Sequence, residues 1–226
     1  MTLMKKNLRL LTILLICVAG VDILWLFFPD YIFRKYTIIL TIPILILFYF
    51  LYVEVKNILY LLALVVFMLA DYFFFIQGKL ANGIASSGVA LAIYGIIVLK
   101  QSHYISTRRL LVNTVPFLAI YTLPFIFFVD KIDDAIFGEV IFYSFAIGYF
   151  SFMSIMTYFS RKNKVTQKLI LAGLSTAFMG IVFGMYLFVD RKPVYTVVSN
   201  LLFIYSHYKM WQYIIIKDSI DETVKI

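Results

Sequence analysis

The stretch from Ile58 to Gln77, ILYLLALVVFMLADYFFFIQ, limits the folds open to this chain more than any other. It is long and apolar enough to cross a bilayer, which takes about 20 residues of helix. It contains one carboxylate, Asp71. An acid at the centre of a membrane helix costs about 2.5 to 3.5 kcal/mol on insertion scales, so it usually faces a bundle interior or a wet cavity. Asp71 is therefore a candidate for function, or for a structural hydrogen bond to a neighbouring helix.

The composition of the whole chain agrees with that stretch. Of its 226 residues, 63% are hydrophobic and 14% are charged, and the mean hydropathy is +0.97. Soluble domains average about 45 to 50% apolar and about 25% charged residues, so we expect an all-α integral membrane protein. Basic residues in cytoplasmic loops account for the net charge of +8. We expect no nucleic-acid partner, because no basic run is interleaved with aromatics on a soluble domain.

Eight apolar runs of membrane-spanning length follow one another along the chain and fill it as a single transmembrane domain, residues 1–226. The connections are too short to hold a soluble domain. No cleaved signal peptide is expected, because the first run continues past h-region length without an Ala-x-Ala-like site. The expected spans are residues 8–28, 37–53, 57–76, 80–99, 110–129, 137–159, 168–189 and 194–216.

The distribution of Lys and Arg predicts the topology. With the N-terminus inside, the cytoplasmic segments carry 13 basic residues and the outer segments carry 6, while Lys209 lies within the last span. This excess favours eight helices with both termini in the cytoplasm. The outer set is Arg34, Lys35, Lys79, Lys131, Arg191 and Lys192.

Small residues gather in two of the expected spans. The fourth span contains Gly83, Gly88 and Gly95, and the seventh contains Gly173 and the pair Gly180 and Gly184 in a GxxxG spacing. Such spacings let helix backbones approach closely, although they also arise by chance in apolar sequence. We expect both spans to be tightly packed central helices.

Several polar residues inside the spans are expected at a common depth. At 1.5 Å of rise per residue, five of them lie roughly 8 to 11 Å below the outer surface, and His207 lies at roughly 20 Å. Asn200, Phe203, His207 and Trp211 also share one face of the last helix. We expect a polar cavity that opens toward the outer half of the bilayer, the alternative being unrelated polar groups satisfied locally. The five residues are Asp22, Asp71, Ser86, Ser87 and Asn200.

The chain carries no established catalytic or metal-binding motif. It has no HExxH, GxSxG or Walker loop and no Cys/His cluster. Cys17 is the one cysteine, which excludes an intramolecular disulfide and a cysteine-based metal site. His103 and His207 are too few for a multi-histidine site, so we expect neither a metal nor a cofactor.

Five local features follow one another along the chain: Ile42-Pro43-Ile44, Leu69-Ala70-Asp71, the Gly-rich span from Gly83, the span opened by Gly173, and Tyr205-Ser206-His207. Over nearly the whole chain they resemble the YhhN family of eight-helix membrane proteins, whose best-known activity is lysoplasmalogenase. The resemblance implies Asp71 and His207 as site residues and Pro43 as a structural match. The family's Lys before that Pro and Gly before that Asp are here Ile42 and Ala70, and its His in the fourth span and Asp in the seventh have no counterpart.

The activity that the resemblance implies is cleavage of the vinyl-ether bond of a lysophospholipid. Vinyl ethers hydrolyse by protonation at carbon, and burial in an apolar medium favours the protonated form of a carboxyl group. Asp71 is therefore the expected general acid, and Asp22 its ionised partner. We expect His207 to orient water or bind the headgroup, and the substrate to contact Ser86, Ser87 and Asn200.

Two other classes remain open. Intramembrane Asp and His also serve proton relays, so a small polar-solute or proton-coupled transporter is the runner-up. The absent second-half carboxylate leaves room for a non-catalytic family member. The expected partners are a lysophospholipid and membrane lipids. The expected location is the inner membrane of a bacterium, since helical bundles are not outer-membrane barrels.

Overall fold

Helices make up nearly all of the chain in a computed structural model that describes residues 2–54, 56–101 and 107–224. No strand occurs within those ranges. The elements, in chain order, are α1 (Thr2–Trp25), α2 (Arg34–Ile38), α3 (Thr41–Tyr52), α4 (Ile58–Asp71), the π-helix η1 (Tyr72–Gln77), α5 (Leu80–Gln101), α6 (Thr107–Phe128), the 3-10 turns η2 (Val129–Lys131) and η3 (Asp134–Ile136), α7 (Phe137–Ser160), α8 (Lys164–Phe188) and α9 (Pro193–Val224).

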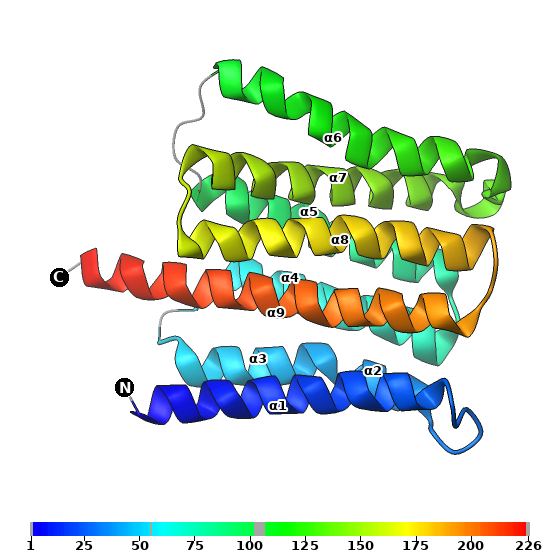
Figure 1. Cartoon of the computed structure of the whole chain (residues 1–226), viewed down its shortest axis with the longest axis horizontal. Helices are drawn as coiled ribbons and strands as arrows, with labels where there is room; N and C mark the ends of the chain where they lie inside the picture. The colour runs from blue at the N-terminus through cyan, green and yellow to red at the C-terminus, as the bar shows by residue number, and fades with distance from the viewer. Residues whose placement is uncertain (1, 55, 102–106, 225–226) are drawn as a thin grey trace.

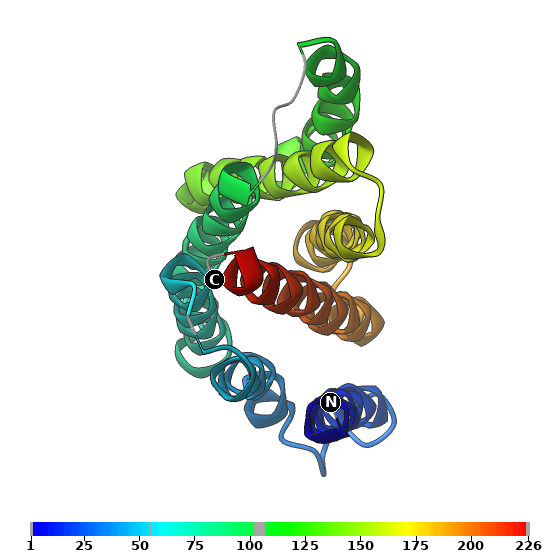
Figure 2. The ribbon, with the colours of Figure 1, turned by 90° about the vertical axis from the view of Figure 1, so that its left-hand side faces the viewer.

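The long helices run side by side along one direction, and the two chain ends lie at the same end of the bundle (Figure 1). Seen end on, α3, α4, α5 and α7 form a curved layer, and α8 and α9 lie against its concave side (Figure 2). α9 packs most extensively on α8, while α6 contacts mainly α7 at the periphery. The α1–α2 and α8–α9 connections both lie at the end of the bundle opposite the chain termini.

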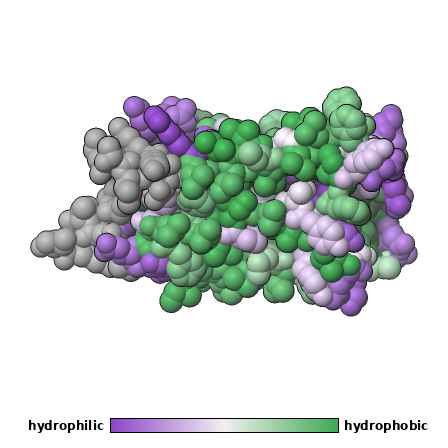
Figure 3. All heavy atoms as spheres, turned by 90° about the horizontal axis from the view of Figure 1, so that it is seen from below, coloured by the Kyte–Doolittle hydropathy of each residue, from purple (hydrophilic) through white to green (hydrophobic). Residues whose placement is uncertain are grey.

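Five helical segments of the described chain are long and apolar enough to cross a membrane: Arg34–Tyr52, Ile58–Gln77, Leu80–Gln101, Asp134–Ser160 and Lys164–Phe188. The surface agrees, because an apolar band separates hydrophilic residues at the two ends of the visible face (Figure 3). The other three expected spans coincide with α1, α6 and α9, and their crossing of the membrane stays a prediction. α9 continues as helix to Val224, beyond the expected end at residue 216.

The second expected span is interrupted where the sequence analysis assumed a continuous helix. α2 begins at Arg34, before the expected start at residue 37, and α3 begins only at Thr41. Pro43 lies in the first turn of α3, where its missing N–H costs no helical hydrogen bond. A helix running straight through would need that N–H to bond the carbonyl four residues earlier, so the proline explains the break after α2.

The stretch around Asp71 is not a uniform α-helix. The side chain of Asn57 caps α4 by accepting a hydrogen bond from the Tyr60 N–H at 3.2 Å. The α-helical geometry ends at Asp71, and η1 continues to Gln77. Gly78 then ends the element with a φ of 65°, a left-handed conformation that glycine adopts without strain. Local π-helical segments are rare and frequently occur at functional sites.

Close helix packing is confirmed in the seventh expected span. A Cβ on Gly173 of α8 would lie 2.6 Å from the Cβ of Ser154 and 3.2 Å from the Cα of Ser151 on α7. The Ser151 hydroxyl donates to the carbonyl of Gly173 at 2.9 Å across this contact. The missing side chain thus lets two backbones approach and form an interhelical hydrogen bond.

Candidate functional site

A cavity of about 450 Å³ lies at the end of the bundle opposite the chain termini. Its position follows from its lining, which includes the last residue of α1, Trp25, the first of α2, Arg34, and Arg191 between α8 and α9. Most of the lining is apolar and aromatic. The polar side chains that line it include Arg34, Asp71, Ser87, Arg191, Thr196 and Asn200. A cavity is therefore present where one was expected, but its lining is mainly apolar, it includes two arginines that were assigned to loops, and Asp22 is not part of it.

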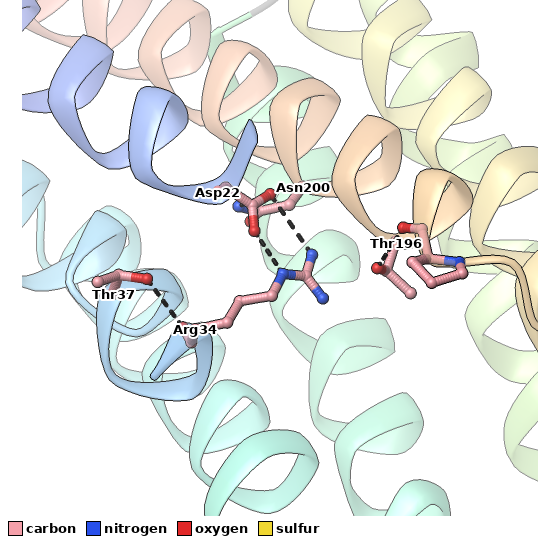
Figure 4. Close-up of polar contacts among 6 residues, drawn as sticks. Asp22, Arg34, Thr37, Thr196 and Asn200 are labelled. Carbon is pink, nitrogen blue, oxygen red and sulfur yellow. Dashed lines mark hydrogen bonds and ion pairs between the residues drawn. The ribbon is translucent and has the colours of Figure 1, made fainter. Parts of the chain in front are cut away.

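Asp22 of α1 is fully buried and forms a clamp with α2 and α9 (Figure 4). The Arg34 Nε forms an ion pair with Oδ1 of Asp22, and its Nη2 lies 3.4 Å from Oδ2. The Asn200 side-chain amide donates to the same Oδ2 at 3.0 Å. Both oxygens of Asp22 thus have donors, and one of these donors, Asn200, lies 178 positions from Asp22 in the sequence.

Arg34 is held from a second side as well. Its guanidinium lies 4.7 Å from the ring centroid of Trp25, which is a cation–π distance. The side chain is 13% exposed, so most of it is inside the protein. Sequence reasoning placed Arg34 in an outer loop and missed this role. The available signal was Asp22 itself, because a carboxylate inside an apolar helix needs a cation, and Arg34 follows only 12 residues later.

Asp71 has a different environment. It is 6% exposed, lines the cavity, and is the last α-helical residue before η1. Its Oδ2 atom is buried and has no hydrogen-bond partner in the part of the chain that the structure describes. Buried polar atoms without partners are uncommon, and each one asks for an explanation such as a catalytic role or a bound molecule.

His207 lies outside the lining of the cavity. Its ring is in contact with Phe67 and Phe203, at centroid distances of 4.3 and 4.2 Å, and both of these phenylalanines do line the cavity. Its Nδ1 atom is 3.0 Å from the Tyr94 hydroxyl. His207 is therefore separated from the cavity by two aromatic rings, and any effect on a molecule bound there would pass through them.

The two expected serines also differ. Ser87 of α5 is 8% exposed and lines the cavity. Ser86 is half-buried and is not part of the lining. Consecutive residues on a helix point about 100° apart, and here that rotation takes the Ser86 side chain away from the cavity.

Asp71 and Asn200 face the cavity at nearly the same depth. Phe67 of α4 and Phe203 of α9 contact each other with ring centroids 6.1 Å apart. The two helices run in opposite directions, and Asp71 and Asn200 each lie about one turn from these phenylalanines toward the cavity end. The two residues therefore lie at a common level along the bundle, as expected, and their depth below a membrane surface stays a prediction.

The fold and the cavity define a helical membrane protein with an internal site that is apolar in its body and polar on a few sides. Among the described residues, no group of three or more His, Cys, Asp or Glu side chains is arranged to hold a metal ion. No known protein family, curated protein sequence or solved structure matches this chain.

Proposed function

We propose that this chain is a membrane-embedded lipid hydrolase, similar to lysoplasmalogenase, that cleaves the vinyl-ether bond of a lysoplasmalogen. The observation that supports the proposal is the Asp71 carboxyl group, buried on the cavity wall with its Oδ2 free of any hydrogen-bond partner. The aromatic lining suits an alkyl chain, and the polar groups suit a glycerol backbone. A single-chain amphiphile combines these two properties.

In the proposed reaction, protonated Asp71 donates its proton to the vinyl carbon farther from the ether oxygen. The resulting cation is shared between the other vinyl carbon and the ether oxygen, and the Asp71 carboxylate stabilises it. Water adds to that carbon and loses a proton to Asp71. The hemiacetal then breaks its bond to the glycerol oxygen while its hydroxyl proton passes to that oxygen, giving a fatty aldehyde and a glycerophospho-alcohol. One water is consumed and the acid is regenerated.

The proposal gives the other candidates supporting roles. Asp22 was expected to act on the substrate as an ionised partner, but its oxygens are engaged by Arg34 and Asn200. It therefore acts as a positioning residue that holds the wall, and Asn200 faces the cavity beside it. Ser87 supplies a hydroxyl to the glycerol or to the attacking water. His207 positions Phe67 and Phe203 and does not touch the substrate.

The proposal includes eight membrane spans with both termini in the cytoplasm of a bacterium, the spans crossing the inner membrane. The two chain ends lie at one end of the bundle, as an even number of spans requires. In this orientation the cavity opens on the outer side. An engineered tag that is accessible only from outside at either terminus would exclude it.

The experiment that tests the activity uses purified full chain in detergent and three lysolipids with the same chain length and headgroup. We expect aldehyde from the vinyl ether, and none from the saturated ether or the ester. In D₂O, with the aldehyde reduced as it forms, the alcohol should carry one deuterium at carbon 2, because the proton is added to carbon. Folded protein that releases no aldehyde from the vinyl ether would overturn the proposal and favour the transporter or a non-catalytic protein.

A further inference from the structure

The mouth of the cavity carries two arginines whose surroundings differ. Arg34 is neutralised by Asp22 and stacked on Trp25. Arg191 lines the same cavity, is exposed to the outside, and makes no ion pair among the described residues. The acid next to it, Asp190, is taken by Lys192 at 2.7 Å, and this hydrogen bond raises the pKa of the Lys192 ammonium group. Arg191 therefore presents an uncompensated guanidinium at the opening.

The first turn of α9 adds to this positive mouth. α9 begins at Pro193, and both Pro193 and Thr196 line the cavity. The N-terminal end of a helix carries a partial positive charge and unpaired N–H groups. Arg191 lies two residues before that turn, so an anion at the opening would meet the guanidinium and the helix end together.

The distance from the mouth to Asp71 fits one class of ligand. Asn200 lies seven residues beyond Pro193, about 10 Å along the helix, and Asp71 faces the cavity at the depth of Asn200. In a lysoplasmalogen the carbon that accepts the proton is separated from the phosphorus by seven bonds, about 8 Å when extended at the advance per bond of a polypeptide chain. A phosphate at Arg191 would thus bring the vinyl ether to the level of Asp71.

We propose that Arg191 binds the phosphate group of a single-chain lysophospholipid and sets its register, with the alkyl chain among the cavity phenylalanines. The proposal rests on the lipid-hydrolase function, which identifies the bond that reaches Asp71 as a vinyl ether. The predicted ligand of Arg191 is a phosphate attached to a lipid, since the aromatic lining of the cavity makes no favourable contact with a free phosphate. Guanidinium groups suit phosphate because their planar donors match two of its oxygens.

The test measures equilibrium binding of a saturated-ether lysophosphatidylcholine, which the proposed reaction cannot cleave, to the full chain in detergent. Its affinity is compared with that of the alkylglycerol of equal chain length. We expect the wild type to bind the phosphate-bearing lipid about tenfold more tightly, the factor for one hydrogen-bonded charge pair. Arg191→Gln should remove the difference and leave alkylglycerol binding unchanged. Inorganic phosphate at millimolar concentration should not compete.

Lys35→Gln is the matched control, because it removes the same charge from an exposed residue of α2 at the same end of the bundle, which does not line the cavity and leaves the Lys192–Asp190 pair intact. Equal effects of the two variants would overturn the proposal, as would competition by inorganic phosphate at the affinity of the lipid. Arg191→Lys should keep part of the preference, and gel filtration checks folding. The probe is not cleaved, so the binding measurement tests the role of Arg191 without depending on catalysis. A protein that prefers the phosphate-bearing lipid but releases no aldehyde from the vinyl ether would contradict only the proposed hydrolase activity.

Discussion

Asp22 and Asp71 are both carboxylates buried in apolar helices at the same end of the bundle, and their surroundings differ in kind. Asp22 receives Arg34 on one side and the Asn200 amide on the other. Asp71 leaves its Oδ2 without a partner on the wall of a cavity. The first arrangement uses the acid to join α1, α2 and α9. The second leaves an acid available for chemistry, so burial alone does not separate a structural carboxylate from a reactive one.

The largest effect that follows from this difference concerns Asp71→Asn. Under the proposed function we expect aldehyde release to fall about 10² to 10⁴-fold, the usual contribution of a general acid, while the stability of the protein changes by less than about 1 kcal/mol, because no hydrogen bond to Oδ2 is lost. Turnover and thermal unfolding in the same detergent measure both. Asp30→Asn, the same change at an exposed loop position, is the control. Unchanged turnover in folded Asp71→Asn would remove the acid role.

Asp22→Ala should show the opposite pattern and weaken folding first. Removing one partner of a largely buried ion pair leaves Arg34 uncompensated, and we expect a loss of about 3 kcal/mol in the free energy of unfolding. Replacing Arg34 as well, in Asp22→Ala with Arg34→Met, should recover most of that loss because apolar pairs of similar size are often equally stable. Denaturant unfolding of the single and double variants measures the difference. A double variant no more stable than the single one would argue against the clamp.

Asn200→Ala tests the second donor to Asp22. The Arg34 ion pair remains, so we expect a loss of about 1 kcal/mol, the value of one hydrogen bond. Combined with Asp22→Ala, the effect of Asn200→Ala should largely disappear, since residues in one network are not additive. Fully additive losses in this double-mutant cycle would show that Asn200 stabilises the protein through another contact.

The smallest predicted effect distinguishes neighbouring serines. Ser87→Ala should raise KM for the proposed substrate about threefold, at the low end of what one neutral hydrogen bond contributes, with no measurable loss of stability. Ser86→Ala should leave KM unchanged, because Ser86 does not line the cavity. Steady-state kinetics of the two variants give the comparison. Equal KM changes in the two variants would contradict the assignment of Ser87, and not Ser86, to the cavity wall.

Much of the candidate site was visible in the sequence. Asp71, Ser87 and Asn200 were expected to share a cavity at one depth, and all three line it. Depth was predictable because helix rise converts residue number into distance along the bundle. The direction in which each side chain points around its helix was not predicted correctly. Asp22, Ser86 and His207 were expected at the site and do not line it, because the direction in which a side chain points matters only relative to where the neighbouring helices lie.

The lengths of the apolar runs, the helical class and the common level of Asp71 and Asn200 follow from local properties of the chain, and one amino-acid sequence suffices to state them. The partner of each polar residue does not. Asp22 meets Asn200 across 178 residues and Arg34 through a break in the second span. Asp71 remains without a partner at Oδ2 because no donor among the described residues of the neighbouring helices reaches it. Those outcomes depend on how separate helices pack, and therefore had to come from the folded chain.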